Sequence, residues 1–234
     1  MIKKALSICL LLALEIIAGP QQPAVIGCGA FPAGAPVTPY LIGQNYWFFR
    51  ADLPDLPFPT VKNSGVTIVR IGGRTFDNTP LTDAQLLQQV DKIRSIGAEP
   101  LIQVSRHHTA ATAAATVQYI NGANARNVKF WSIGNEPDLG FVGGEVQLAA
   151  AVAVYIKQIS PAMRDVDPSI TIIAPDMAFY SATKFSELLG GASDITGKDA
   201  QGRYYIDCIS FHRYGASTFT REQACARVFH RIGY

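Results

Sequence analysis

The sequence of 234 residues predicts an α/β fold made of repeated strand–helix units. Three observations lead to this prediction: short runs rich in Val, Ile and Leu recur, longer amphipathic or alanine-rich stretches separate them, and the runs begin on average 33 residues apart. The runs occupy residues 41–44, 66–71, 99–104, 128–133, 170–174 and 206–211. Their hydrophobicity is continuous rather than alternating, which is typical of strands buried on both faces of a parallel sheet. The chain therefore has the pattern of about six βα units.

Composition narrows the classes of protein that the chain could represent. Hydrophobic residues make up 48% of the sequence and charged residues 16%. The chain can therefore form a large core and is not disordered, collagen-like or a coiled coil. The formal net charge is only +2, and no long run of Lys and Arg could follow a phosphate backbone. We expect no nucleic-acid partner.

The first 19 residues have the layout of a secretory signal peptide. Lys3 and Lys4 precede an apolar run, residues 5–14, and the small residues Ala18 and Gly19 follow it. The run is too short to span a membrane, so we expect a secreted or cell-surface protein without stable membrane insertion. A buried N-terminal helix is the alternative interpretation of this segment.

Residues 20–40 are rich in Gly, Pro and Ala, which is typical of a linker. Within them, residues 25–28 resemble a lipoprotein cleavage box, which makes a lipid-anchored Cys28 an alternative N-terminus. The spacing of Cys28, Cys208 and Cys225 matches no zinc or redox signature, so we expect no metal and no cofactor. Because Cys208 lies in an apolar run, we expect it to be a buried free thiol.

Helices with recognisable ends lie between the predicted strands. Thr82 and Gln85 form a capping box, and the helix that they begin is expected to stop at Gly97. Pro161 is expected to end or bend the longest helix. The further helices are predicted over residues 109–121, 145–164 and 183–189 and from residue 221 onward.

This alternation fits both a (β/α)₈ barrel and a doubly wound sheet. No Gly-x-Gly-x-x-Gly loop follows a predicted strand, which disfavours a nucleotide-binding doubly wound sheet. Barrel enzymes carry their chemistry at the C-terminal ends of the strands. Polar motifs follow three of the runs, at residues 70–73 (RIGG), 134–138 (GNEPD) and 212–214 (HRY). We therefore predict a (β/α)₈ (TIM) barrel over residues 41–234 that is C-terminally incomplete, with about six units present.

These motifs resemble those of the clan A retaining glycoside hydrolases, whose (β/α)₈ barrels carry an Asn-Glu pair at the end of strand four. Residues 70–77 together with residues 134–138 are most similar to the heparanase and β-glucuronidase branch, and similar strings occur in the xylosidase and endoglucanase branches. The resemblance covers about residues 41–214. It implies a carbohydrate substrate without identifying the sugar.

The resemblance also implies a role for each residue of the motifs. Retaining cleavage uses one carboxylic acid to protonate the leaving oxygen and a second carboxylate, about 5 to 5.5 Å away, to attack the anomeric carbon. By its match to the motif, Glu136 is the acid/base and Asn135 binds a sugar hydroxyl beside the scissile bond. Arg70 is expected beneath the nucleophile, which its charge keeps ionised. A solvated loop carboxylate and a structural ion-pair residue are the alternatives for Glu136 and Arg70.

Three further aromatic residues are candidates for substrate binding. His212 and Tyr214 are expected to orient the nucleophile or to line the sugar site, and Trp47 is expected to stack on a sugar face. A core histidine and a core tryptophan are the alternatives for His212 and Trp47. His107 and His108 follow the third run, where a place in the cleft and a place in a surface loop are equally consistent with the sequence.

The nucleophile of the clan is a glutamate at the end of strand seven, and the predicted units run out before that strand. Glu222 follows the sixth run but lies in a helical pattern. We expect either a truncated hydrolase or a non-catalytic carbohydrate-binding relative, and the pairing of Glu136 with Asn135 favours the hydrolase. A third option is an inverting hydrolase with Asp176 as the base, which requires carboxylates about 6.5 to 9.5 Å apart. The sequence does not indicate an oligomeric state.

Overall fold

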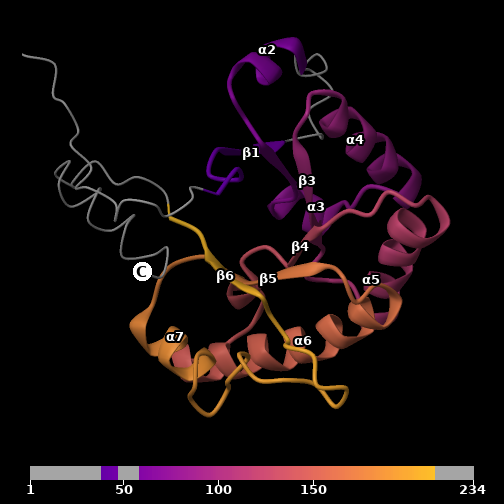
Figure 1. The fold of residues 1–234 in the computed structure, drawn as a ribbon. Helices are drawn as coiled ribbons and strands as arrows, with labels where there is room; N and C mark the ends of the chain where they lie inside the picture. The colour runs from indigo at the N-terminus through magenta and orange to yellow at the C-terminus, as the bar shows by residue number, and fades with distance from the viewer. Residues whose placement is uncertain (1–37, 47–57, 214–234) are drawn as a thin grey trace, which may run out of the picture. The chain divides into compact units, whose positions relative to one another are not determined.

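Six parallel strands form one sheet, in which each strand pairs with the next one along the chain (Figure 1). The computed structural model describes residues 38–46 and 58–213. Every pairing between neighbouring strands is parallel. The strands are β1 (Gly43–Tyr46), β2 (Ile68–Ile71), β3 (Glu99–Val104), β4 (Phe130–Ile133), β5 (Thr171–Met177) and β6 (Cys208–Phe211).

The consecutive order of the strands distinguishes between the two architectures that the sequence allows. A doubly wound sheet reverses its strand order at a switch point, whereas a barrel adds each strand beside the previous one. The order β1-β2-β3-β4-β5-β6 is that of a barrel. The described sheet is therefore a partial barrel, and the α/β prediction is confirmed.

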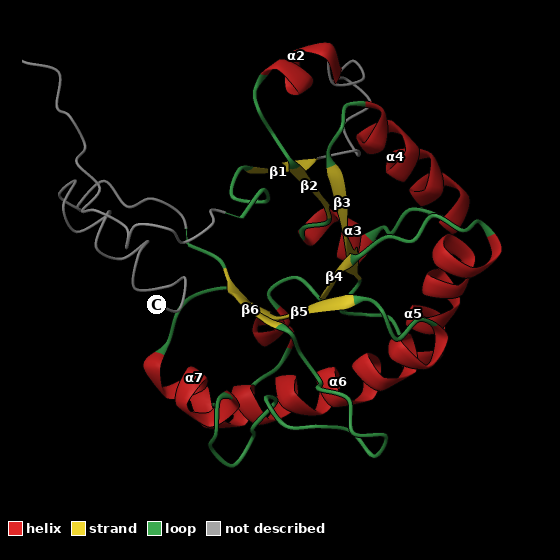
Figure 2. Ribbon diagram, viewed as in Figure 1, coloured by secondary structure: helices red, strands yellow, loops and turns green. Residues whose placement is uncertain are grey.

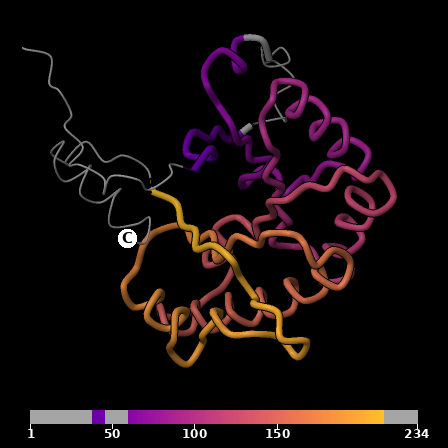
Figure 3. The backbone as a smooth tube through the Cα atoms, viewed as in Figure 1, coloured from indigo at the N-terminus to yellow at the C-terminus, as the bar shows by residue number. Residues whose placement is uncertain are grey.

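Helices alternate with the strands and lie on the outer side of the sheet (Figures 2 and 3). In Figure 2, α4, α5, α6 and α7 follow one another in an arc around the strands. The helical elements are α2 (Phe58–Asn63), α3 (Arg74–Asn78), α4 (Asp83–Ser95), α5 (Ala110–Val117), a π-helical turn (Gln118–Ala123), a 3₁₀ turn (Pro137–Gly140), α6 (Glu145–Val166) and α7 (Ala182–Leu188). The predicted signal peptide, most of the linker-like segment and the helix predicted from residue 221 lie outside the described residues.

The sequence of α4 accounts for both its beginning and its packing. The Gln85 N–H donates to Thr82 Oγ1, and the Thr82 N–H donates to Gln85 Oε1, so the predicted capping box is present. Leu86, Val90 and Ile93 recur on one helical face and are buried in the core. Each such burial stabilises the fold by about 1.5 to 3 kcal/mol.

The longest helix, α6, continues past Pro161 to Val166. Of the two effects expected of Pro161, an end or a bend, the end is therefore wrong. Packing beyond the proline explains the continuation, because Met163 is fully buried and Arg164 donates to the carboxylate of Asp207 at 2.6 Å. Within the described part of the chain, α6 is the helix with the length and hydropathy of a membrane span. Its buried face packs against α5, α7 and the strands β4 and β5, as a core helix does.

Cys208 is a free thiol, as predicted, but it is exposed rather than buried. It begins β6, which pairs with β5 on one side, and Ile209 beside it is also exposed. The apolar run therefore indicated a strand correctly. It did not indicate burial, because β6 is the last strand of the described sheet and pairs with β5 alone among the described strands, whereas the inner strands have a neighbour on each side.

Candidate active site

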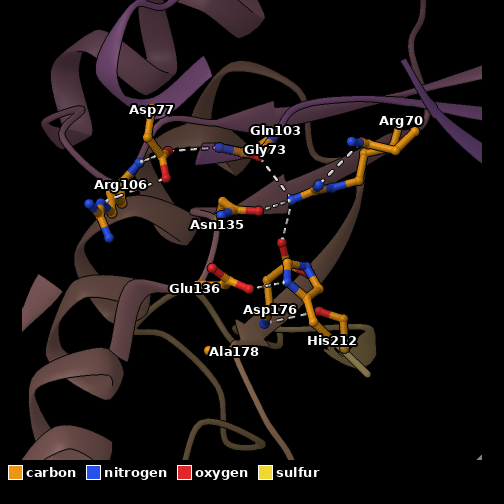
Figure 4. A network of polar contacts seen from close by, with 12 residues as sticks. Arg70, Gly73, Asp77, Gln103, Arg106, Asn135, Glu136, Asp176, Ala178 and His212 are labelled. Atoms are coloured by element: carbon orange, nitrogen blue, oxygen red, sulfur yellow. Dashed lines mark hydrogen bonds and ion pairs between the residues drawn. The ribbon is translucent and has the colours of Figure 1, made fainter. Parts of the chain in front are cut away.

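Polar side chains from β2, β3, β4, β5 and β6 gather at the C-terminal ends of the strands (Figure 4). Four of the residues singled out from the sequence meet there: Arg70 from β2, Asn135 and Glu136 after β4, and His212 after β6. All four line one cavity of about 620 Å³. This volume lies in the range of small-molecule sites. Trp47 and Tyr214 lie outside the described residues.

Arg70 is the centre of the cluster. Its Nη2 atom donates to Asp176 Oδ2 at 2.7 Å and lies 3.0 Å from Asn135 Oδ1. The same atom lies 2.9 Å from Gln103 Oε1, and Nη1 donates to Asn45 Oδ1 at 3.3 Å. One guanidinium thereby connects β1, β2, β3 and β5 with the segment after β4. Among the described residues, the acidic partner of Arg70 is therefore Asp176, a carboxylate at the end of β5.

Gln103 is a site residue that sequence reasoning missed. Its side chain is buried in β3, where Oε1 accepts from the Gly73 N–H at 2.6 Å and Nε2 donates to Asp77 Oδ1 at 2.7 Å. A Cβ atom at Gly72 would lie only 2.8 Å from Gln103 Cβ. The two glycines after Arg70 therefore leave room for Gln103 and provide it with a donor. A lone amide within the apolar run 101–104 was the available signal.

Asp77 extends the cluster on the side of β3. It lies in α3 and is almost fully buried, and the Arg106 N–H donates to its Oδ1 at 2.9 Å. Burial raises the pKa of Asp77, while the Arg106 N–H and the charge of Arg106 act in the opposite direction and only partly offset it. Asp77 therefore serves to fix Gln103 and the start of the loop after β3.

Glu136 and His212 form the second half of the site. His212 Nδ1 lies 2.9 Å from Glu136 Oε1, and His212 Nε2 lies 3.5 Å from Asp176 Oδ1. Figure 4 shows the imidazole of His212 between the two carboxylates. The side chains of Glu136 and His212 are 16% and 20% exposed, which leaves them accessible from the cavity.

The backbone around the two carboxylates is unusual. Glu136 and Asp176 have φ angles of 49° and 51°, in the left-handed region that non-glycine residues rarely adopt. The Glu136 N–H donates to the Asp176 carbonyl at 2.9 Å, and the Asp176 N–H donates to Ser210 Oγ at 3.0 Å. Such conformations cost about 1 to 3 kcal/mol each and cluster at functional sites.

The pKa values of His212 and Asp176 move in opposite directions. The contact with Asp176 raises the pKa of His212, and Glu136 adds to this effect, whereas burial and Arg70 oppose it. Burial would raise the pKa of Asp176, but the contact with His212 and the charge of Arg70 outweigh burial and lower it. Asp176 is therefore an ionised carboxylate, and His212 binds a proton more readily than an ordinary histidine.

His107 and His108 lie apart from this cluster. His107 lines a smaller cavity of about 160 Å³ with Arg106 and Tyr155, and His108 is half-buried. Burial lowers the pKa of His108. Across residues 38–46 and 58–213, no group of three or more His, Cys, Asp and Glu side chains is arranged to hold a metal ion.

Neither a protein-family model nor a curated protein sequence matches the chain. Solved structures match it in fold. The bifunctional glucanase-xylanase CelM2 from a metagenome library aligns at a TM-score of 0.57 and 13% identity, covering 79% of this chain and 56% of that chain. AbfB, a family 51 α-L-arabinofuranosidase from Bifidobacterium longum, aligns at a TM-score of 0.52 and 17% identity, covering 70% and 45%.

A third structure, a xyloglucanase of glycoside hydrolase family 44 from Paenibacillus polymyxa, aligns at a TM-score of 0.50 and 13% identity, covering 76% of this chain and 52% of that chain. At such identities the likeness is one of fold. The chain spans about half the length of these structures. It therefore shares the partial barrel with part of each of them.

Proposed function

We propose that this chain belongs to a retaining glycoside hydrolase of clan A in which Glu136 is the acid/base. The observation that carries the proposal is the pair Asn135 and Glu136, which follows the fourth strand of a consecutively ordered parallel sheet and lines a cavity. The names of the similar structures, a glucanase-xylanase, an arabinofuranosidase and a xyloglucanase, all refer to carbohydrates. The proposed substrate is an oligo- or polysaccharide, and the proposed location is outside the cell or at its surface.

The contacts of Asn135 and Glu136 suit these roles. Asn135 Oδ1 faces Arg70 Nη2, so the amide nitrogen of Asn135 is left to donate to a sugar hydroxyl. Glu136 lines the cavity and contacts His212 through Oε1. In the proposed reaction Glu136 protonates the leaving oxygen as the glycosidic bond breaks, and it then takes a proton from the attacking water.

The nucleophile in this proposal is a carboxylate from a further strand. Among the described residues, Glu136 is the one carboxylate that lines the cavity. Asp176 is not a cavity-lining residue, and its side chain is only 7% exposed. The inverting alternative with Asp176 as base therefore has less support, because a base must reach a water molecule. Within the clan we propose the heparanase and β-glucuronidase branch, because residues 70–77 and 134–138 resemble it most. Two residues of the first string, Gly73 and Asp77, bind the side chain of Gln103 on β3.

A non-catalytic carbohydrate-binding barrel is the second candidate. The single cavity-lining carboxylate among the described residues favours it, because binding needs no second carboxylate. Reaction with an external nucleophile distinguishes the two functions, because only a site with an acid catalyst should support it.

The first experiment measures binding and turnover by the 234-residue chain. We expect β-linked oligosaccharides to bind, as followed by calorimetry, and Asn135→Ala to weaken this binding at least about tenfold by removing a hydrogen bond to the sugar. Aryl β-glycosides should not be hydrolysed. Hydrolysis that disappears in Glu136→Gln would show that a second carboxylate acts within these residues. The absence of any binding would overturn both candidate functions.

The second experiment adds azide as an external nucleophile. A hydrolase site that lacks its carboxylate nucleophile should release phenol from a β-phenyl glycoside when azide is present, with formation of the α-glycosyl azide. Glu136→Gln should suppress this reaction for phenyl glycosides far more than for dinitrophenyl glycosides, whose leaving group needs no proton. Glu145→Gln, at the exposed start of α6, is the matched control. Sugar binding without any azide reaction would favour the binding protein.

A further inference from the structure

Asp138 and Lys184 form a buried ion pair close to Glu136, and the proposed function leaves this pair without a role. Asp138 Oδ2 lies 2.6 Å from Lys184 Nζ, and the two side chains are only 1% and 8% exposed. Asp138 lies in the 3₁₀ turn that follows Glu136, whereas Lys184 lies in α7. Neither side chain lines the cavity of about 620 Å³. The pair therefore acts through its neighbours rather than on a substrate in that cavity.

The second carboxylate oxygen of Asp138 binds the segment that follows β5. Asp138 Oδ1 accepts from the Ala178 N–H at 3.0 Å, and Ala178 comes directly after the last residue of β5. The side chain of Asp138 is thus held from two sides, by a backbone N–H and by the ammonium group of Lys184. A buried carboxylate requires such partners, because an unpaired buried charge is strongly destabilising.

The bond from Ala178 to Asp138 replaces one that a regular parallel ladder would make. The Glu136 N–H donates to the Asp176 carbonyl at 2.9 Å, which continues the pairing of β4 with β5. In a regular ladder the Glu136 carbonyl would then accept from the N–H two positions further along, which is that of Ala178. Instead the Glu136 carbonyl accepts from the Leu139 N–H at 3.0 Å. The carboxylate of Asp138 therefore takes the place of the Glu136 carbonyl.

This exchange of acceptors suits the unusual backbone of Glu136. Its φ and ψ angles are 49° and 50°, and such a left-handed conformation costs about 1 to 3 kcal/mol. A regular ladder needs extended dihedral angles at Glu136 instead. Ala178 is fully buried, so without Asp138 its N–H would lack an acceptor, and the Glu136 carbonyl could serve only if Glu136 left the left-handed region. Asp138 removes this competition.

We propose that Asp138 is the positioning residue of Glu136, because its carboxylate, held by Lys184, binds the Ala178 N–H and so keeps Glu136 in the left-handed conformation. In this conformation the Glu136 side chain lines the cavity and lies 2.9 Å from His212 Nδ1. The use of Glu136 as an acid/base rests on the proposed function. Its positioning rests on the contacts of Asp138 alone.

NMR couplings across hydrogen bonds test the proposal in the unsubstituted full chain, since they identify the acceptor of each N–H. We expect the nitrogen of Ala178 to couple to the side-chain carboxyl carbon of Asp138, and that of Leu139 to the carbonyl carbon of Glu136. A coupling from Ala178 to the Glu136 carbonyl carbon would overturn the proposal. So would the absence of the Asp138 coupling in a spectrum that shows the Leu139 coupling. This measurement needs neither a variant nor turnover.

Two double variants separate the positioning from the general stability of the pair. One combines Asp138→Asn with Lys184→Met, and the other combines Asp138→Leu with Lys184→Met. Both remove the two buried charges, but only the asparagine variant keeps an oxygen that can accept from the Ala178 N–H. Replacement of a buried ion pair by uncharged residues of similar size is often neutral for stability, so both chains should fold.

We expect the leucine variant alone to release Glu136. The contact with Asp176 raises the pKa of His212 and the contact with Glu136 adds to this effect, so the pKa of His212 reports on Glu136. It should be lower in the leucine variant than in the asparagine variant and approach its value in Glu136→Gln. The Leu139 amide hydrogen should exchange at least about tenfold faster in the leucine variant. Equal values of both quantities in the two folded variants would show that the pair only stabilises the fold.

The azide reaction distinguishes a failure of this proposal from a failure of the proposed function. Phenol release from a β-phenyl glycoside should be at least about tenfold slower in the leucine variant than in the asparagine variant, with a much smaller difference for a dinitrophenyl glycoside. Equal phenol release in the two variants would overturn the role of Asp138. A chain that shows the expected couplings but no azide reaction would contradict the proposed function and leave the positioning of Glu136 as measured.

Discussion

Asp77 and Asp176 are two buried carboxylates of the cluster around Arg70, the first linked to Arg70 through Gln103 and the second directly, and their pKa values move in opposite directions. Asp77 is 2% exposed and Asp176 is 5% exposed, so burial alone does not distinguish them. Asp77 faces the amide of Gln103 and a backbone N–H, and burial raises its pKa. Asp176 is also penalised by burial, but the contact with His212 and the charge of Arg70 lower its pKa. Asp77 also has a cationic neighbour, since Arg106 Nε lies 3.7 Å from its Oδ2, whereas Arg70 Nη2 lies 2.7 Å from Asp176 Oδ2. The comparison teaches that the closeness of the cationic partners, rather than depth alone, sets the direction in which the pKa of a buried carboxylate moves.

The largest expected loss of stability comes from removing the positive charge of Arg70, which pairs with Asp176 and not with Asp77. Arg70→Met leaves the Asp176 carboxylate buried without its guanidinium partner. It also removes the Arg70 donor from Asn135 Oδ1 and from Gln103 Oε1, which keeps only the Gly73 N–H. We expect the free energy of unfolding in urea to fall by about 3 to 5 kcal/mol. Arg126→Met, which breaks an exposed ion pair with Asp91, is the control and should change the stability little. Equal losses for the two variants would contradict the central role of Arg70.

Matched amide substitutions compare the two carboxylates directly. Asp176→Asn removes the charge that Arg70 and His212 face, and we expect a loss of about 2 kcal/mol at pH 7. Asp77→Asn should cost about 1 kcal/mol or less, because its Oδ1 can still accept from Gln103 and from the Arg106 N–H. Urea unfolding of both variants under one condition gives the difference. A larger loss of stability for Asp77→Asn than for Asp176→Asn would contradict this expectation.

A larger residue at Gly72 tests the contact between Gln103 and Asp77 by changing the packing around Gln103 rather than a charge. A Cβ atom at Gly72 would approach Gln103 Cβ to 2.8 Å, so Gly72→Ala must displace the side chain that links Arg70 to Asp77. We expect a loss of about 1 to 3 kcal/mol in urea unfolding. Gly197→Ala is the control, since its Cβ would meet only Asp194 Oδ2 at 3.7 Å. Similar stabilities for the two alanine variants would show that Gln103 moves aside without cost.

The smallest effect is the pH dependence, whose sign differs between the two carboxylates. The lowered pKa of Asp176 stabilises the fold above the ordinary aspartate pKa, and this contribution is lost as the pH falls through the folded-state pKa. The raised pKa of Asp77 acts in reverse, so its contribution is present at low pH and is lost as the pH rises. Unfolding between pH 5 and pH 2 should therefore show the cost of Asp176→Asn shrinking and that of Asp77→Asn growing as the pH falls. A parallel response of the two variants would show that both carboxylates titrate alike.

The sequence predicted the elements well because their signals are local. Runs rich in Val and Ile marked the inner strands, and Thr82 and Gln85 marked the start of α4. The strand β1 begins two residues later than its predicted run, residues 41–44. The meeting of Arg70, Asn135, Glu136 and His212 was also predictable, because parallel strands bring their C-terminal ends to one edge of a sheet. Their catalytic roles stay predictions.

The partners of these side chains were not predictable in the same way. Asp176 was considered as a base, whereas it pairs with Arg70 and His212, and Gln103 was not considered at all. Which atoms an arginine on β2 reaches depends on the register of β3 and β5 and on the left-handed backbone at Asp176. The exposure of Cys208 likewise depends on its place in the last described strand rather than on its neighbours in sequence.

The consecutive order of the strands has a consequence for how the chain folds. Each strand pairs with the strand that leaves the ribosome just before it, so the sheet can grow one unit at a time with short loop closures. The bond from Arg70 to Asp176 is different, because it joins residues that are 106 positions apart. The guanidinium group of β2 must therefore wait for β5 to be synthesised and docked. The strand order thus implies that this ion pair can form only after β2 to β5 have come together.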